Sequence, residues 1–593
     1  MNTPAQTITP LPASGSYRSA ASAVAIILLI ASPILIFGPS VLRNRFVNWD
    51  DQGQLYQNPD FNPPCFKSVI KSWSTPHMNL YMPLTYSLWG GVAAVARVKA
   101  DSTGITLNPV WFHGLNLLLH IGATLAVFAI LRRLIGLIWP AFGGAMLFAV
   151  HPIQTEAVCW ASGMYTVLSG LLIFLAIFEF VRFARSRGRA ASAHYIIATI
   201  LFVAAMLSKP SAVVALPMAA ILDLLLIRRN FPATIRSLSP WLILTIPIIF
   251  IILQTQPARI VPDQPVWMRV IVCLDSIGFY IVKAIYPLHF AVDYGRTPTW
   301  LRSHPAAIWM ALPAVTLLVV SWSVRRKMPW LLTGTGLLVA GTLPFLGLLK
   351  FDFQHFSTVA DRYVYAGMLG AALIAAGGLA SWRSALVKIV WAVTLCGLAW
   401  DSYGQAGFWK DTRTLFNHNL KVNSHSLEAH GNLGFLDMGE GRPEEAIEHY
   451  RRALATDPAD PDANTNLGNA LMARGDLGEA IDHFRRALRS TPNDPRIENN
   501  LGIALALSHQ YQEAAREFQG ALVDDGSDPE SGKDVRAAAH TNLGLLLQKF
   551  GRFEEAAAEY QAALAADPHY NLAQTGLKSL PARGANPSDS NGR

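Results

Sequence analysis

Long apolar segments without charge alternate with short polar, arginine-rich ones along the first part of the chain. The first segment, Ala21 to Gly38, is long enough as a helix to cross a bilayer at about 1.5 Å per residue. The pattern predicts membrane-spanning helices near 21–40, 111–131, 136–150, 165–181, 192–208, 211–227, 238–253, 305–323, 329–349, 363–380 and 384–402. Residues 21–404 are therefore predicted to form an all-α polytopic helix bundle with about 11 spans.

Arginine clusters give these segments an orientation. The clusters that end alternate spans are Arg132-Arg133, Arg182 to Arg189, Arg228-Arg229 and Arg325-Arg326-Lys327. Because cytoplasmic loops are enriched in Lys and Arg, these ends are predicted to face the cytoplasm. The scheme requires residues 268–290 to lie at the membrane interface rather than cross it. Residues 1–20 are then a cytoplasmic tail and 41–110 the first outer loop of a protein in a bacterial-type cytoplasmic (inner) membrane.

Beyond residue 404 the apolar segments give way to internal repetition. The triplet Asn-Leu-Gly recurs at 432–434, 466–468, 500–502 and 542–544, each time followed by alanines and one large aromatic residue at fixed offsets. The first two intervals have the 34-residue period of the tetratricopeptide repeat, a helix pair that stacks into a superhelix with a concave binding face. The sequence predicts an extracytoplasmic α-solenoid of such repeats over 405–580, with a partial leading repeat at 409–424 and a disordered tail at 581–593.

The same two parts of the chain differ in net charge. Residues 1–400 contain 12 acidic and 29 basic residues, whereas the remainder contains 28 acidic and 19 basic residues. Since the excess bases flank apolar spans, the net charge of +8 gives no indication of nucleic-acid binding, and no such partner is expected. The four cysteines follow no metal-binding or redox spacing, and neither a metal nor another cofactor is predicted.

Two adjacent acids, Asp50 and Asp51, follow the first span. Two carboxylates repel each other and attract no lipid headgroup, so a solvated turn is one interpretation and chemistry is the other. A carboxylate is a common general base when a hydroxyl loses its proton as it attacks. The pair therefore marks a candidate active site on the outer side of the membrane.

Cations and hydrogen-bonding residues gather on the same predicted side. They occur in His151-Pro152-Ile153-Gln154-Thr155-Glu156, Ser208-Lys209-Pro210, Asp293-Tyr294-Gly295-Arg296 and Asp361-Arg362-Tyr363, with His355 shortly before the last motif. Each motif alone is also explained by a turn or by an arginine that reaches lipid phosphate. Together, beside a carboxylate pair, they favour a substrate that carries phosphate.

In this order the motifs resemble those of the transmembrane and tetratricopeptide-repeat-containing O-mannosyltransferases and of bacterial multispan proteins with C-terminal repeats. Those proteins are GT-C membrane glycosyltransferases. The resemblance implies transfer of a sugar from a polyprenyl-phosphate donor to an extracytoplasmic acceptor, with a protein hydroxyl as the leading choice and the repeats recruiting it. A single displacement at the anomeric carbon would invert its configuration.

The resemblance also implies a role for each candidate residue. Asp50 is expected to be the general base and Asp51 its partner, although the two roles can be exchanged. Arg362, Lys209 and Arg296 are expected at the donor phosphate, and His151, Glu156, Asp361, Tyr363 and His355 around the sugar or the acceptor. Two alternatives stay open: a non-enzymatic membrane-anchored scaffold, which has no need of the acidic pair, and a transferase for a cell-envelope glycan or lipid, which leaves the repeats unexplained.

Overall fold

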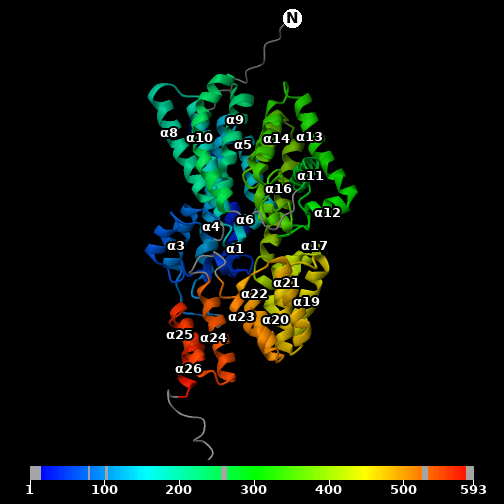
Figure 1. The fold of residues 1–593 in the computed structure, drawn as a ribbon. Helices are drawn as coiled ribbons and strands as arrows, with labels where there is room; N and C mark the ends of the chain where they lie inside the picture. Colours follow the sequence, from blue (N-terminus) through cyan, green and yellow to red (C-terminus); the bar gives the residue numbers. More distant parts are fainter. Residues whose placement is uncertain are drawn as a thin grey trace, which may run out of the picture. The chain divides into compact units, whose positions relative to one another are not determined.

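The structure is a computed structural model, and its fold is all-α (Figure 1). It describes residues 15–77, 80–100, 104–255, 264–382, 384–523 and 532–581. Within these ranges the regular elements are all helical and no β-strand occurs, as predicted. Most of the predicted cytoplasmic tail and nearly all of the predicted disordered tail lie outside the described residues.

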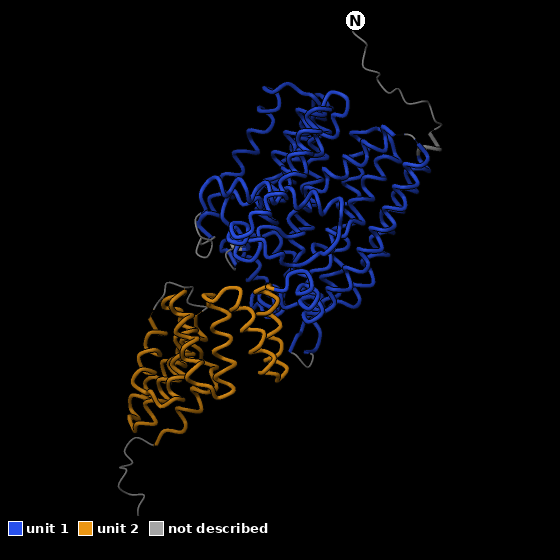
Figure 2. The backbone as a smooth tube through the Cα atoms, turned by 90° about the vertical axis from the view of Figure 1, so that its right-hand side faces the viewer, with its two compact units in different colours: residues 1–424 blue, residues 425–593 orange. Residues whose placement is uncertain are grey.

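The chain divides into two compact units, unit 1 (residues 1–424) and unit 2 (residues 425–593) (Figure 2). The division falls after Ser424 rather than after residue 404, because helix α17 (Thr412–Val422) is bonded within unit 1. The backbone N–H of Asp293 donates to Asn419 Oδ1 at 3.1 Å, and Asn423 Nδ2 donates to Asp293 Oδ2 at 3.1 Å. The segment expected to be a partial leading repeat is therefore part of unit 1.

Unit 1 is a bundle of apolar helices. Those long and apolar enough to cross a membrane lie in α1 (Gly15–Arg43), α4 (Pro109–Ile135), α7 (Met164–Ala184), α8 (Gly188–Ser208), η3–α9–η4 (Pro210–Ile227), α10 (Phe231–Thr255), η5–α13 (Pro305–Ser323) and α16 (Ala385–Phe408). Three shorter apolar helical segments are α5 (Ile138–Val150), α14–η6 (Pro329–Phe345) and α15 (Met368–Ser381). Each of the predicted spans corresponds to one of these helices or segments, so the chain has the helices of a multi-pass membrane protein.

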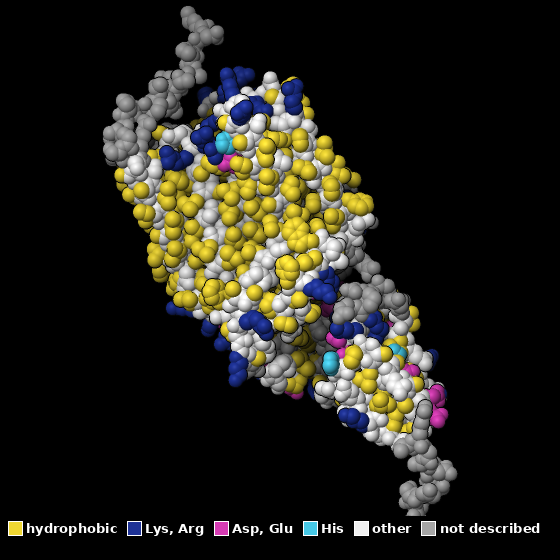
Figure 3. All heavy atoms as spheres, turned by 90° about the vertical axis from the view of Figure 1, so that its left-hand side faces the viewer, with side chains coloured by type: hydrophobic (Ala, Val, Ile, Leu, Met, Phe, Trp, Pro, Cys, Tyr) yellow, Lys and Arg dark blue, Asp and Glu magenta, His cyan; other side chains and the backbone are white. Residues whose placement is uncertain are grey.

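The surface of unit 1 fits this arrangement. Hydrophobic side chains cover a broad face of the unit, and Lys and Arg side chains lie at both ends of that face, most densely at one of them (Figure 3). On α10, Ile243 and Leu253 are exposed, as is Val393 on α16. Exposed branched apolar side chains on long helices are what a lipid-facing surface requires.

Shorter elements connect the apolar helices and carry most of the candidate site. They are η1 (Gln52–Tyr56), α2 (Phe66–Lys71), α3 (Pro83–Ala96), η2 (Pro152–Gln154), α6 (Thr155–Cys159), α11 (Val266–Ile285), α12 (Pro298–Ser303), η7 (Asp352–His355) and η8 (Asp361–Val364). Helix α11 covers most of the segment predicted to lie at the interface. It buries Asp275 and Lys283.

Unit 2 is a series of antiparallel helix pairs. Its helices are α18 (Leu427–Gly439), α19 (Pro443–Thr456), α20 (Pro461–Arg474), α21 (Leu477–Ser490), α22 (Pro495–Leu507), α23 (Tyr511–Gly520), α24 (Lys533–Lys549), α25 (Phe553–Ala566) and α26 (Asn571–Ser579). The recurring glycine explains the close approach within a pair. A Cβ on Gly468 would lie 2.8 Å from Cε1 of Phe484, and a Cβ on Gly434 would lie 2.6 Å from Cε1 of Tyr450.

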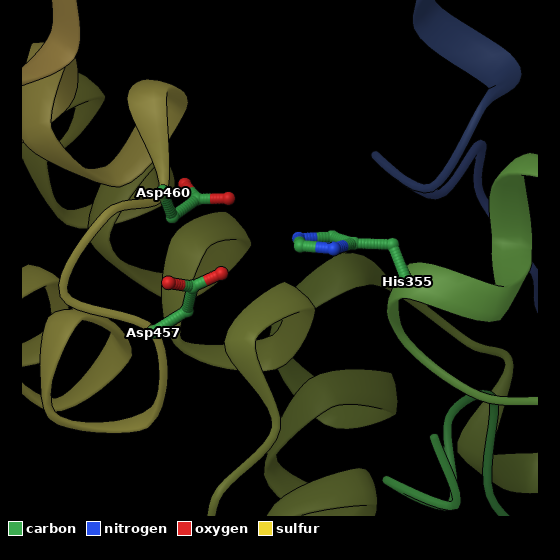
Figure 4. A group of neighbouring side chains, drawn as sticks. All are labelled: His355, Asp457 and Asp460. Carbon is green, nitrogen blue, oxygen red and sulfur yellow. The ribbon is translucent and has the colours of Figure 1, made fainter. Parts of the chain in front are cut away.

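Polar side chains also recur at matching positions in unit 2. His430 and His449 join α18 to α19 through their Nδ1 atoms at 2.9 Å, and His483 and Asn464 join the next pair at 2.9 Å. The connection between α19 and α20 carries Asp457 and Asp460 (Figure 4). Asp460 caps α20 by accepting a hydrogen bond from the backbone N–H of Ala463 at 2.7 Å.

Candidate functional site

The acidic pair lies in the turn between α1 and η1, and Asp51 is its buried member. Its Oδ2 accepts from the backbone N–H of Val47 at 2.9 Å, and its Oδ1 accepts from the backbone N–H and the hydroxyl of Ser162 at 2.9 and 2.6 Å. Burial raises the pKa of Asp51 to about 6, although these hydrogen bonds oppose the shift. With both oxygens engaged, Asp51 fixes the turn against the loop after α6.

The segment that leads into the acidic pair is also held by distant residues of unit 1. The backbone N–H of Arg45 donates to the carbonyl of Lys410 at 2.8 Å, and the backbone N–H of Asn48 donates to Thr412 Oγ1 at 2.9 Å. These bonds join the loop after α1 to the segment that begins α17. The backbone on both sides of Trp49 is therefore anchored.

Asp50 is the exposed member of the pair. Solvent reaches its side chain, yet the surrounding protein displaces enough water to raise the pKa of Asp50 to about 7, while the positive charge of Arg362 opposes the rise and Asp51 adds to it. A carboxylate with a pKa near 7 is suited to accept a proton at neutral pH. The geometry therefore distinguishes an exposed acid that is free to react from a buried acid that holds the turn.

Arg362 and Glu156 form a buried ion pair. Arg362 Nη1 pairs with Glu156 Oε1, and the backbone N–H of Arg362 donates to Glu156 Oε2 at 2.9 Å. The guanidinium also lies over the ring of Phe353, 4.4 Å from its centroid, and its Nη2 donates to the Tyr363 hydroxyl at 3.4 Å. Glu156 thereby fixes a cation whose field reaches Asp50.

Lys209, between α8 and η3, lines a small pocket together with Arg362 and Tyr363. Its Nζ donates to Thr166 Oγ1 at 3.0 Å and lies 4.7 Å from the centroid of the Tyr165 ring. Burial and the neighbouring charge of Arg362 lower the pKa of Lys209 to about 7. Lys209, Arg362, Tyr363 and Thr166 line one small pocket, here called the cationic pocket.

Two predicted residues have other partners. His151 is buried: its Nε2 donates to the carbonyl of Ala284 at 3.2 Å and its Nδ1 accepts from the backbone N–H of Ile153 at 3.2 Å. Burial lowers the pKa of His151 to about 4, so it is neutral at pH 7 and caps η2 rather than presenting itself to a ligand. Arg296 pairs with Asp275 of α11, with Nε 3.1 Å from Oδ2, rather than with the cationic pocket.

The remaining predicted residues, Asp361, Tyr363 and His355, do not share one pocket. Asp361 accepts a hydrogen bond from the Tyr294 hydroxyl at 2.8 Å, and burial together with the charge of Glu156 raises its pKa well above the usual range. Asp361 and Glu156 line a second pocket, separate from the one that holds Tyr363. His355 is on η7 (Figure 4), where its ring packs edge-on to Phe356 at 5.0 Å.

The structure adds residues that the motifs did not indicate. Ser162 binds Asp51, Thr166 binds Lys209, and Trp160 lies 5.6 Å from the Arg362 guanidinium. All three follow the His-Pro segment within a short stretch, and the contact of Ser162 with Asp51 spans 111 residues of sequence. A stretch rich in aromatic and hydroxyl residues was the only available signal.

Comparison with known proteins identifies the repeats of the chain. Residues 433–495 and 499–571 match a family model described as tetratricopeptide repeat. Unit 2 is a tetratricopeptide-repeat domain.

A larger part of the chain is similar to named transferases. The protein O-mannosyl-transferase TMTC1 of Homo sapiens is 26% identical over 73% of this chain and 55% of its own length. The corresponding values are 22%, 73% and 63% for protein O-mannosyl-transferase F38B6.6 of Caenorhabditis elegans, and 23%, 70% and 49% for TMTC3 of Homo sapiens. The chain is homologous to protein O-mannosyl-transferases. It spans roughly half the length of these curated relatives.

Proposed function

We propose that this protein is a GT-C-type membrane glycosyltransferase that moves a sugar from a polyprenyl-phosphate donor to a hydroxyl of an acceptor protein. The observation that carries the proposal is the exposed Asp50, which has a pKa of about 7 and is close enough to Arg362 to be affected by its positive charge. Arg362 in turn lines the cationic pocket with Lys209. The names of the homologous O-mannosyl-transferases support the same reaction class and make mannose the first sugar to test.

The proposed reaction is a single displacement. The acceptor oxygen forms a bond to the anomeric carbon while Asp50 takes the hydroxyl proton, and the bond from that carbon to the phosphate oxygen breaks. The phosphate leaves with the electron pair, and configuration inverts. Arg362 and protonated Lys209 stabilise the negative charge that develops on the leaving phosphate.

Glu156 and Asp51 are positioning residues in this scheme. Glu156 holds one edge of the Arg362 guanidinium, which leaves the remaining N–H groups to approach the phosphate. Asp51 holds the turn that presents Asp50. Asp50, Arg362 and Lys209 therefore carry the proposed chemistry, and unit 2 would recruit the acceptor protein through its repeats.

A transfer assay with purified full-length protein tests the proposal. The assay pairs a panel of polyprenyl-phosphate sugars, mannose first, with protein, glycan and lipid acceptors, and uses Asp50→Asn as the inactive control. We expect transfer to protein that depends on Asp50. Transfer to glycan or lipid alone would support the cell-envelope alternative, and no transfer by folded protein with any donor would support the scaffold.

We also propose that unit 2 faces the outside of the cytoplasmic membrane. The support is the arginine-rich ends of α4 and α7, each of which carries Arg in its last turn. A reporter that is active only in the cytoplasm, fused after Ser424, is expected to give no signal. A cytoplasmic signal would separate the repeats from Asp50 and contradict the orientation.

A further inference from the structure

A groove lies between the helices that end unit 2. It has a volume of about 520 Å³ and is lined by α24, by the first residue of α25 and by α26 (Figure 1). Ligand pockets in proteins commonly measure about 300–1,000 Å³, so the groove has room for the side chains of a partner. None of its residues takes part in the proposed reaction.

Helical spacing explains how α26 can line the groove and still be held in place. Leu572, Thr575 and Ser579 follow one another at intervals of three and four residues, so they share one face of the helix, and all three line the groove. Ala573 and Leu577 lie on another face and pack in the apolar cluster with α25. One face of α26 therefore holds the helix, and another face is left for a partner.

The polar side chains that α24 contributes are already bound within unit 2. Gln548 Nε2 donates to Ser579 Oγ at 3.1 Å, and Gln548 Oε1 accepts from the Tyr560 hydroxyl at 2.7 Å. Lys549 Nζ donates to the Tyr511 hydroxyl at 2.6 Å. These bonds join α24 to its neighbours on both sides. The groove is therefore a fixed shape rather than a set of polar groups that wait for a ligand.

Apolar side chains from all three helices are exposed at the groove. Leu545 of α24 is 48% exposed, Phe553 of α25 is 37% exposed and Leu572 of α26 is 62% exposed. Single exposed apolar residues are common on protein surfaces, whereas a group that converges on one hollow is typical of an interaction site. The groove therefore favours an apolar group.

The charge of the groove differs from that of the unit around it. Residues 425–593 contain 26 acidic and 16 basic residues, an excess that attracts basic partners. Among the described residues that line the groove, Lys549 is the only charged one, and its charge is positive. A basic side chain is therefore attracted to the unit but not to the groove, and an uncharged apolar side chain fits the groove better.

We propose that this groove, here called the anchor groove, binds a large apolar side chain of the acceptor polypeptide, such as leucine or phenylalanine. The inference rests on the proposed function, because it specifies which acceptors the repeats recruit. A polypeptide is the occupant that a tetratricopeptide-repeat surface fits. Residues 582–593 of the same chain follow α26 but contain no leucine, isoleucine, valine, methionine or aromatic residue, so they do not match the groove.

Peptide binding to full-length protein in nanodiscs tests the proposal. Labelled, blocked peptides of glycine, serine and asparagine contain one threonine and one anchor residue, which is leucine, phenylalanine, asparagine or lysine. We expect the leucine and phenylalanine peptides to bind about tenfold more tightly than the other two, because the groove removes their side chains from water. Equal binding of all four peptides by the wild type would overturn the inference.

Two variants locate the site. Leu545→Ser combined with Leu572→Ser is expected to abolish the preference for leucine and phenylalanine, a coupling between peptide and protein that indicates direct contact. Because both side chains are exposed, the thermal midpoint is expected to stay unchanged. Val523→Ser is the matched control, since Val523 is 68% exposed and lies outside the groove, and it is expected to keep the preference. A preference that survives in the double variant would overturn the inference.

The same proteins and peptides are then compared in the transfer assay. The apolar anchor is expected to lower the acceptor KM of the wild type about tenfold with kcat and the donor KM unchanged, and to have no effect in the double variant. Transfer by the wild type with equal acceptor KM for all peptides would overturn the inference and leave the proposed function standing. Anchor-dependent binding without transfer to any acceptor would support the groove as a polypeptide site and overturn the proposed function.

Two further measurements examine other occupants of the groove. A wild type that is dimeric by mass photometry, and a double variant that is monomeric, would assign the groove to a second copy of the chain and overturn the inference. A leucine preference that appears only after residues 582–593 are removed would mean that these residues fill the groove, which would also overturn it. A monomer whose preference is the same with and without these residues would support the proposal.

Discussion

Buried polar side chains pair over short sequence distances in unit 2 and over long ones in unit 1. In the repeats, His430 with His449 and Asn464 with His483 each join neighbouring helices over 19 residues. In the membrane unit, Asp51 binds Ser162 over 111 residues, and the pair of Arg362 and Glu156 spans 206. The first kind of contact can form as each repeat forms, whereas the second requires most of the unit to be in place.

Because of this difference, we expect substitutions in the two units to have different effects. Each repeat contacts only its neighbours, so a substitution in unit 2 is expected to change local stability. In unit 1 the long-range pairs hold charged groups near one another, so a substitution there is expected to change the reaction. Four experiments, ordered by expected effect, examine that contrast.

Asp50→Asn gives the largest expected effect. Because asparagine keeps the size of aspartate and cannot take the proton, transfer is expected to fall by about two to four orders of magnitude. The side chain is exposed, so donor binding and the thermal midpoint are expected to persist. The measurement is single-turnover transfer, with Asp60→Asn in the same loop as the control. Equal activity in the two variants would remove Asp50 from the mechanism.

Arg362→Ala is expected to damage both folding and donor binding. Removing one partner of a buried ion pair costs about 3–5 kcal/mol, because Glu156 is left charged and buried. The double variant Glu156→Gln with Arg362→Gln removes both charges and is expected to recover most of the thermal midpoint while donor affinity stays low. Donor affinity that recovers with stability would mean that Arg362 acts through the fold alone.

The dependence of activity on pH provides the third test. Asp50, with a pKa of about 7, is a base only when deprotonated, so activity is expected to rise with pH up to that value. Lys209, with a pKa of about 7, is a cation only when protonated, so donor capture is expected to fall above it. The ratio kcat/KM for donor should therefore peak near pH 7 and fall about tenfold per pH unit on either side.

Lys209→Arg sharpens the pH test. Arginine keeps its charge at every relevant pH, so the loss of activity above pH 7 is expected to disappear while the loss below pH 7 stays. An unchanged alkaline limb in this variant would assign that limb to another group.

A glycine of the repeats gives the smallest expected effect on the reaction. A Cβ at Gly468 would lie 2.8 Å from the Phe484 ring, so Gly468→Ala is expected to destabilise unit 2 by about 1–3 kcal/mol. Transfer to a short peptide should be unchanged. Gly478→Ala is the control, since its Cβ meets nothing within 4 Å. A large loss of peptide transfer in Gly468→Ala, but not in Gly478→Ala, would show that transfer depends on the stability of unit 2 and would contradict the expected independence of the two units.

The features that sequence predicted well are those carried by local periodicity. The apolar segments located the helices of unit 1, and the recurring Asn-Leu-Gly located the repeats. The structure divides the chain after Ser424, later than the predicted residue 404, and α17 has an amphipathic pattern like that of a repeat helix. What assigns it to unit 1 is a set of hydrogen bonds from Asn419 and Asn423 to a distant loop, which no local pattern reveals.

The candidate site was predicted in part. The motif order drew attention to Asp50, Glu156, Lys209 and Arg362, and the structure places the last three in contact with one another or with a shared pocket. The ion pair of Glu156 with Arg362 did not follow from the motifs, because both residues were expected to face ligand. His151 illustrates the converse: a histidine beside a proline has the composition of a catalytic turn, but its ring nitrogens are used by the backbone.

The bonds that anchor the loop after α1 set an order of events during synthesis. A chain made from its N-terminus presents Asp50 early, whereas the partners of Arg45 and Asn48 are Lys410 and Thr412, which are made after every apolar helix of unit 1. Two of the bonds that anchor this loop can therefore form only after the last apolar helix of unit 1 has been made, although the loop itself is synthesised early. The bonds between Asp51 and Ser162 can form earlier, so the loop is fixed in two stages.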